Sequence, residues 1–168
     1  VGNVFLPSGK DTEQGQQIME RAVVTEGLEL LGWRDVPVDN TTIGVTARSA
    51  EPVIKQIFVG AGADVKDQLA FERRLYCVRK RTAWGVRRAG LNDNNENFYV
   101  CSLSSKTLIY KGQLMAPQVE TYYPDIKDPH MVSALALAHS RYSTNTFPSW
   151  GRAQPFRYIA HNGEINTV

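Results

Sequence analysis

The residues best suited to chemistry lie in the last third of the chain. Residues 139–150 read HSRYSTNTFPSW and follow an apolar run, and residues 161–164 read HNGE. Arg141 would stand near the end of a strand, where a guanidinium can bind a carboxylate through two parallel N–H bonds. The amide of Asn162 and the backbone N–H of Gly163 are two adjacent donors suited to an oxyanion. The pattern predicts a small-molecule site, and the alternative is a polar loop followed by an ordinary β-turn.

Other groups that could do chemistry carry weaker patterns. Cys77 and Cys101 have no CxxC partner, and no histidine stands at a metal-ligand spacing from either of them. Both thiols are therefore predicted to be structural, and no metal site is expected. The glycines at positions 60 and 62 fall short of a phosphate-binding loop, because the GxGxxG spacing and a following Lys-Ser/Thr are missing.

A basic run occupies the middle of the chain. Its members are Arg73, Arg74, Arg79, Lys80, Arg81, Arg87 and Arg88. Nucleic-acid binding would need aromatic side chains interleaved on the same face, but Phe71 belongs to the apolar stripe. The run is interpreted as a solvated helix face or as a contact to another part of a larger protein, and nucleic acid is not expected as a partner.

Length and composition favour a globular domain. The chain has 168 residues, 42% of them hydrophobic, and a net charge of only +2. About 100–200 residues form one typical domain, and this apolar fraction argues against disorder. No apolar run approaches the length of a membrane-spanning helix, so no membrane partner is expected. The two cysteines do not make a disulfide scaffold.

The hydrophobic pattern indicates which elements position these groups. Helices are predicted over 12–31, ended by Gly32, and over 66–88. Strands are predicted at 1–6, 33–38, 53–59, 98–103, 107–111, 134–140 and 156–160, with a further β-branched run at 43–46. Residues 113–123 fit no single element. Because neighbouring strands join like hairpins, the pattern favours the α+β class over a strictly alternating one.

The C-terminal motifs resemble a known family. Residues 139–150, followed by HNGEINT at 161–167, closely resemble the glutaminase domain of glutamate synthase large subunits, a class II glutamine amidotransferase of the N-terminal-nucleophile hydrolase kind. Upstream stretches are similar as well, so the resemblance covers nearly the whole chain. These stretches are LGWRDVP at 31–37, EP at 51–52, FERRLY at 71–76, SLSS at 102–105 and YKG at 110–112.

The resemblance implies a fold and a reaction. The family fold is a four-layer αββα sandwich, and this chain is expected to be an internal piece of it, incomplete at both ends. The family nucleophile is an N-terminal cysteine whose own amino group is the base, and its thiolate attacks the amide of glutamine. The chain begins instead at Val1, so residues 1–168 are expected to lack the nucleophile segment and the C-terminal remainder of the domain. Alone, the chain is expected to have no glutaminase activity.

The resemblance also implies residue roles. Arg141 would bind the α-carboxylate of glutamine, and Asn162 and Gly163 would hold the tetrahedral oxyanion. Tyr142 and Thr144 would line the same pocket. The motifs therefore assign the carboxylate clamp and the oxyanion hole to this chain, but not the attacking atom.

The implied cofactors and partners lie mostly outside the chain. No cofactor is expected in this segment, whereas FMN and an iron–sulfur cluster are expected in the full-length enzyme. L-glutamine, the downstream synthase domains and a small reductase subunit or ferredoxin are the expected partners. The expected location is the cytoplasm, or the plastid of a photosynthetic eukaryote.

Two alternatives stay open from the sequence. The chain could be a non-catalytic remnant that serves as a binding or assembly module, or another class II amidotransferase. The segments 147–150 and 164–167 favour glutamate synthase over the phosphoribosyl-type and sugar-type members.

Overall fold

A computed structural model describes residues 1–91, 98–142 and 147–161. The chain divides into two compact units. The first comprises Val1–Asp35 and Pro52–Ile109 and contains the sheet, and we call it the sheet unit. The second comprises Val36–Glu51 and Tyr110–Val168, and we call it the loop unit. Each unit is described by itself.

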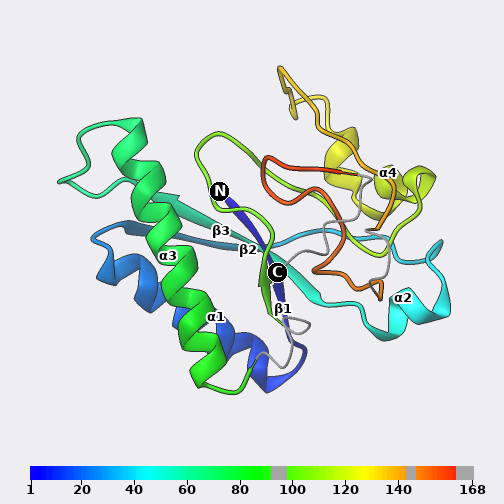
Figure 1. Cartoon of the computed structure of the whole chain (residues 1–168), viewed down its shortest axis with the longest axis horizontal. Coiled ribbons are helices and arrows are strands. Elements are labelled where there is room, and N and C mark those ends of the chain that lie inside the picture. The colour runs from blue at the N-terminus through cyan, green and yellow to red at the C-terminus, as the bar shows by residue number, and fades with distance from the viewer. Residues whose placement is uncertain (92–97, 143–146, 162–168) are drawn as a thin grey trace. The chain divides into compact units, whose positions relative to one another are not determined.

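The sheet unit is built on an antiparallel sheet with the strand order β2-β3-β1-β4 (Figure 1). The strands are β1 (Gly2–Leu6), β2 (Glu29–Asp35), β3 (Val53–Gly60) and β4 (Tyr99–Val100). β1 and β3 are rich in Val, Ile and Phe and pair over the whole of β1. The predictions of strands at 1–6 and 53–59 are thus confirmed.

Two long helices, α1 (Lys10–Thr25) and α3 (Gln68–Arg88), pack against each other and against the sheet (Figure 1). Their apolar stripes and alternate sheet residues form one core. Its most deeply buried members are Val4, Leu6, Met19, Val23, Ile57, Leu75, Val78 and Val86. Burial of each such side chain contributes about 1.5–3 kcal/mol, so this core is the main source of stability of the unit.

α1 ends earlier than the predicted boundary at Gly32. Gly27 has a positive φ of 66°, and its N–H donates to the Val24 carbonyl at 3.0 Å. The N–H of Leu28 donates to the Val23 carbonyl at 3.1 Å, which completes a Schellman cap. The predicted helix over 12–31 is therefore wrong beyond Thr25, and Leu30 and Leu31 belong to β2.

α3 begins and ends close to where the sequence predicts. The Asp67 carboxylate accepts a hydrogen bond from the Ala70 N–H at 2.7 Å, which is an N-cap. At the other end Gly90 has a φ of 71°, and the Leu91 N–H donates to the Val86 carbonyl at 3.1 Å. Both ends are specified by local residues, and the predicted helix over 66–88 is confirmed except for its first two residues.

The predicted hairpin of 98–103 with 107–111 is wrong. Only Tyr99–Val100 forms a strand there, and residues 107–111 form none. The N–H groups of Cys101 and Ser102 both donate to the carbonyl of Asn3, at 2.9 and 3.3 Å, which breaks the regular ladder. The Ser102 hydroxyl then accepts from the Ile109 N–H at 3.2 Å, so a side chain replaces the second strand of the hairpin.

Three further strand predictions fall in the loop unit and are wrong. The β-branched run at 43–46 leads instead into a short helix, α2 (Val45–Ser49). Residues 134–140 form no strand, and Leu135 is 84% exposed. An apolar extended run becomes a strand only when a neighbouring segment pairs with its backbone N–H and C=O groups. The predicted strand at 156–160 is reduced to one bridge, between Phe156 and Ile159.

The remaining short helices of the loop unit surround an aromatic cluster. They are η1 (Ala116–Gln118), α4 (Val119–Tyr122) and η2 (Pro124–Lys127). The ring of Tyr122 lies 4.7 Å from that of Tyr123 and 5.4 Å from that of Trp150, measured between centroids. Within residues 113–123, which the sequence left unassigned, residues 116–122 thus form short helical turns, and Tyr122 and Tyr123 belong to this cluster.

The predicted α+β class agrees with these elements. In the described part of the chain one antiparallel sheet is combined with α-helices, and helices cover one of its faces. The finer expectation of four layers goes beyond these elements and stays a prediction.

Gly62 offers a test of the packing in the sheet unit. A Cβ at this position would lie 1.8 Å from the Gly27 carbonyl oxygen, so Gly62→Ala forces the backbone apart. We expect it to lower the free energy of unfolding by about 1–3 kcal/mol in urea titrations followed by tryptophan fluorescence. Gly44→Ala is the control, since its Cβ would meet no described atom within 4 Å. Equal stability of the two variants would contradict the close approach.

Candidate functional site

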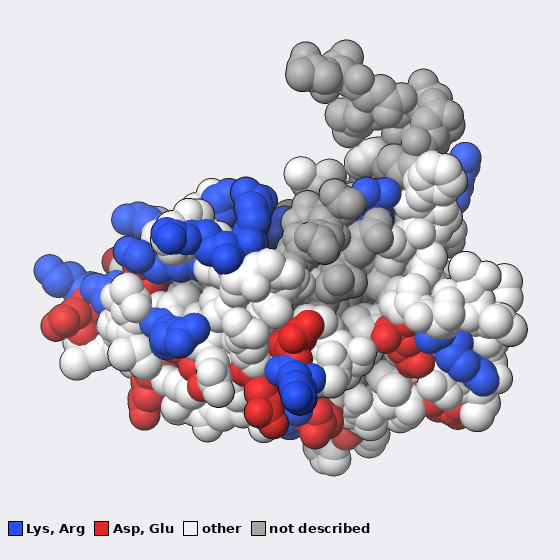
Figure 2. Space-filling model, turned by 90° about the horizontal axis from the view of Figure 1, so that it is seen from below, with Lys and Arg blue, Asp and Glu red and all other residues white. Residues whose placement is uncertain are grey.

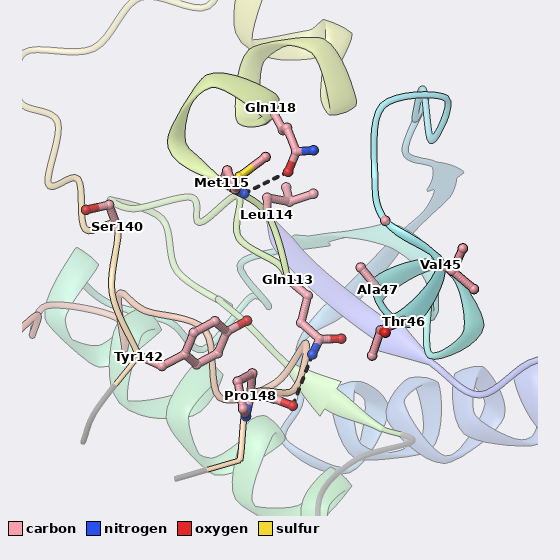
Figure 3. Close-up of a pocket in the computed structure, with 11 residues that line it drawn as sticks. Val45, Thr46, Ala47, Gln113, Leu114, Met115, Gln118, Ser140, Tyr142 and Pro148 are labelled. Atoms are coloured by element: carbon pink, nitrogen blue, oxygen red, sulfur yellow. Dashed lines mark hydrogen bonds between the residues drawn. The ribbon is translucent and has the colours of Figure 1, made fainter. Parts of the chain in front are cut away.

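A pocket of about 490 Å³ opens within the loop unit (Figure 3). Pockets of about 300–1,000 Å³ commonly hold small molecules. Its walls come from three separate stretches of the chain. The lining residues are Gly44, Val45, Thr46, Ala47, Gln113, Leu114, Met115, Gln118, Ser140, Tyr142 and Pro148.

Long-range hydrogen bonds hold these walls together. The indole N–H of Trp150 donates to the Ala47 carbonyl at 2.9 Å, which fixes α2. The Gln118 amide donates to the Thr42 carbonyl at 2.5 Å and accepts from the Met115 N–H at 2.8 Å. The pocket is thus bounded by side chains that bind backbone groups distant in sequence.

Among the described residues that line the pocket, Gln113 has a buried side-chain oxygen that could still accept a hydrogen bond. Its Nε2 donates to the Pro148 carbonyl at 3.0 Å (Figure 3). Its Oε1 is buried and accepts no hydrogen bond from the described residues. Because buried polar atoms are normally paired, this oxygen is suited to accept a hydrogen bond from a bound ligand. Sequence reasoning missed Gln113, because an unpaired side-chain oxygen is visible only once the chain is packed.

Tyr142 also lines this pocket, and its ring points toward Gln113 (Figure 3). Its hydroxyl lies 3.3 Å from the Gly112 carbonyl and 3.3 Å from the Ser149 carbonyl. Burial raises the pKa of Tyr142 to about 12. The phenol is therefore neutral at physiological pH and contributes a donor rather than a charge.

The other predicted site residues are distributed differently. Arg141 is exposed and is not among the residues that line the pocket, although Ser140 and Tyr142 on either side of it are. Its backbone N–H donates to Nδ1 of His139 at 3.1 Å. Thr144, Asn162 and Gly163 lie outside the described residues. Tyr142 thus lines this cavity, and the roles assigned to all five residues stay predictions.

The two cysteines form no disulfide. Cys101 is 1% exposed and follows β4, whereas Cys77 is exposed on α3. In the described residues no group of three or more His, Cys, Asp or Glu side chains could hold a metal ion. No helix among them is long and apolar enough to cross a membrane.

The basic run lies on α3. Figure 2 shows one face of the molecule, and Lys and Arg side chains gather densely in one area of it. Several of these cations have partners inside the sheet unit. Arg74 donates to the Glu26 carbonyl at 2.8 Å, and Arg81 pairs with the Glu26 carboxylate. The guanidiniums of Arg79 and Arg88 stack on Tyr76 and Trp84 at 5.0 and 4.7 Å. These contacts agree with a solvated helix face.

Comparison with known proteins gives this geometry a context. A family model described as "Glutamine amidotransferases class-II" matches residues 1–168, the whole chain. The chain belongs to the class II glutamine amidotransferases. The resemblance that the C-terminal motifs suggested is thereby confirmed.

Curated relatives support the same family. "Glutamate synthase [NADPH] large chain" of Bacillus subtilis (strain 168) is 48% identical over 170 residues, which cover 100% of this chain and 11% of the relative. "Glutamate synthase [NADH]" of Saccharomyces cerevisiae is 47% identical over 178 residues, with 100% and 8% covered. "Ferredoxin-dependent glutamate synthase 1, chloroplastic/mitochondrial" of Arabidopsis thaliana is 42% identical over 172 residues, with 100% and 10% covered. The chain thus spans about a tenth of the length of these relatives.

The phenol of Tyr142 gives this amidotransferase segment a testable alkaline response. Its folded pKa of about 12 lies above the ordinary value near 10, so its contribution to stability is complete below about pH 10 and is lost as the pH rises toward 12. Between pH 9 and 11 we expect wild type to lose about 0.5–1 kcal/mol more unfolding free energy than Tyr142→Phe. Urea titrations at both pH values measure this, and parallel losses would contradict it.

Proposed function

We propose that this chain is part of the glutaminase domain of a glutamate synthase. The observation that carries the proposal is identity of 42–48% to glutamate synthases along the entire chain, together with the family match. In this function the domain hydrolyses the side-chain amide of L-glutamine. The ammonia then reacts with 2-oxoglutarate at a second site, where reduction yields glutamate.

We propose that the loop unit contributes the groups that bind and polarise glutamine. Arg141 would hold the α-carboxylate through two charge-assisted hydrogen bonds. Asn162 and Gly163 would donate hydrogen bonds to the oxyanion of the tetrahedral intermediate, where one donor is typically worth about 2.7–4 kcal/mol. Tyr142 and Thr144 would line the pocket, a role that for Tyr142 is supported by its position in the wall of the cavity.

We further propose that neither cysteine of the chain is the nucleophile. Cys101 is buried at the end of β4, and Cys77 lies on a helix in the sheet unit, away from the glutamine-binding motifs in sequence. The thiolate that attacks the amide carbon would come from another part of the domain. It would form a glutamyl thioester as ammonia leaves, and water would then release glutamate. The 168 residues alone would accordingly lack glutaminase activity.

The cofactors of such an enzyme would lie outside this segment. Iron–sulfur clusters are held mainly by sets of cysteine thiolates, and the chain has two cysteines, one of them buried in the sheet unit. The cluster is therefore assigned to other domains of the polypeptide, and FMN is proposed to bind there as well. The names of the relatives mention NADPH, NADH and ferredoxin, so a reductase subunit or ferredoxin is the proposed source of electrons.

The carboxylate clamp is tested by substitution of Arg141 in the full-length enzyme. Loss of hydrogen bonds between charged groups costs about 1.5–3 kcal/mol each. Because two such bonds are lost, we expect Arg141→Ala to raise KM for glutamine by about 100-fold or more while activity with added ammonium salts is kept. Arg141→Lys keeps the charge but not the bidentate geometry, so its KM for glutamine should lie between those of wild type and Arg141→Ala. Unchanged glutamine kinetics in Arg141→Ala would count against the clamp.

The nucleophile assignment is tested by removal of both thiols. We expect the full-length Cys77→Ser, Cys101→Ala enzyme to hydrolyse glutamine at a rate within about threefold of wild type, since both groups are structural. Ammonia release under saturating glutamine is the measurement. Loss of glutaminase activity in the Cys77→Ser single variant, with the protein still folded, would show that this thiol takes part in the reaction.

A further inference from the structure

A tight turn precedes the oxyanion motif. Phe156 and Ile159 exchange both backbone hydrogen bonds, at 2.8 and 2.9 Å, and form an antiparallel bridge around two turn residues. Arg157, the first of these, has a positive φ of 55°. In an antiparallel pair with this register, each step outward adds one residue on each side, so Gln154 falls opposite His161.

At that step a side chain takes the place of the backbone. The Nε2 of Gln154 donates to the His161 carbonyl at 3.1 Å, and the His161 N–H donates to Oε1 of Gln154 at 2.8 Å. A backbone pair at the same position would form this same pair of bonds. The Gln154 amide is 6% exposed, so its bonds with His161 face little competition from water.

The segment that carries Gln154 is itself fixed to the core of the loop unit. The Lys111 ammonium donates to the carbonyls of Gly151 and Ala153, both at 2.8 Å, and lies 4.8 Å from the centroid of the Phe156 ring. Lys111 is 3% exposed, and its own carbonyl accepts from the Tyr123 hydroxyl at 2.7 Å. The residue before Gln154 is therefore anchored through Lys111 to the aromatic cluster.

We infer that Gln154 is a positioning residue for the oxyanion hole: its side-chain amide fixes the His161 backbone, to which Asn162 and Gly163 are joined in sequence. This inference rests on the proposed function. Oxyanion donors act only when they are held in place before the reaction, and a displacement of about 1 Å can cost 100-fold in rate. Gln154 thus connects the segment anchored by Lys111 to the backbone of His161, the residue that precedes the oxyanion motif in sequence.

Positioning of the oxyanion donors predicts a specific kinetic pattern. The oxyanion exists only in the transition state and the intermediate, so misplaced donors lower kcat and leave substrate binding nearly unchanged. A loss of the carboxylate clamp would instead raise KM and leave kcat nearly unchanged. The kcat-against-KM split therefore separates Gln154 from Arg141.

The test uses the full-length enzyme with Gln154→Met, which keeps the side-chain volume but removes both hydrogen bonds. We expect kcat for glutamine to fall by about 10- to 100-fold, KM to change by less than about threefold, and ammonium-supported activity to be kept. Tyr110→Phe is the control, because it removes one hydrogen bond of the same unit, to Asp125 at 2.8 Å, and should leave kcat within about twofold.

Gln154→Glu gives a readout that a merely structural role would not move. The carboxylate still accepts from the His161 N–H but cannot donate to its carbonyl, whereas the protonated acid can do both. The kcat of Gln154→Glu relative to wild type should therefore rise as the pH is lowered. A ratio that is constant with pH would overturn the positioning role.

The outcomes also separate this inference from the proposed function. If Asn162→Ala loses glutaminase activity but Gln154→Met keeps its kcat, the positioning role is overturned and the proposed function stands. If Asn162→Ala keeps full activity, the oxyanion assignment fails, and the inference about Gln154 fails with it. Equal loss of glutamine-dependent and ammonium-supported activity in Gln154→Met, with loss of folded structure, would show a structural role only and would overturn the inference.

Discussion

The buried ammonium of Lys111 is the interaction on which the loop unit depends. A buried charge is costly unless it is surrounded by hydrogen-bond acceptors, and Lys111 has the carbonyls of Gly151 and Ala153 as well as the face of Phe156. Cation and carbonyls therefore constrain each other. The described residues of the loop unit form short helices and a single bridge. Side-chain-to-backbone hydrogen bonds therefore join its segments, whereas in the sheet unit backbone hydrogen bonds between strands do so.

Hydrogen bonds from side chains to backbone carbonyls also hold the walls of the pocket together. Trp150 fixes α2 through the Ala47 carbonyl, and Gln118 fixes the chain at Thr42, so walls that are far apart in sequence meet around one cavity. Local propensity does not specify these contacts, because each joins a side chain to a backbone group tens of residues away. These side-chain-to-backbone bonds hold the walls of the pocket in place without a regular sheet in the described part of the loop unit.

Predictions from the sequence succeeded where the information is local. α3 has an aspartate N-cap and a glycine beyond its C-terminus, and its predicted range of 66–88 differs from the observed one by two residues at the start only. α1 was predicted too long, because the apolar stripe continues past the Schellman cap at Gly27. The run at 134–140 was predicted as a strand from its apolar pattern alone, but a strand also requires a hydrogen-bonding partner, which the described residues do not provide.

The sequence by itself determined the family, because the motifs at 139–150 and 161–167 are contiguous and can be recognised without the fold. The same motifs supply the residue types on which the proposed site rests. The sequence also determined the class of the fold and the position of its longest helix. Only the tertiary structure decided that Tyr142 shares a cavity with Gln113 and α2, and that the Gln154 amide pairs with the His161 backbone. The reason is that these contacts depend on loop geometry and on the satisfaction of buried polar groups, which are properties of the packed chain and not of any local stretch.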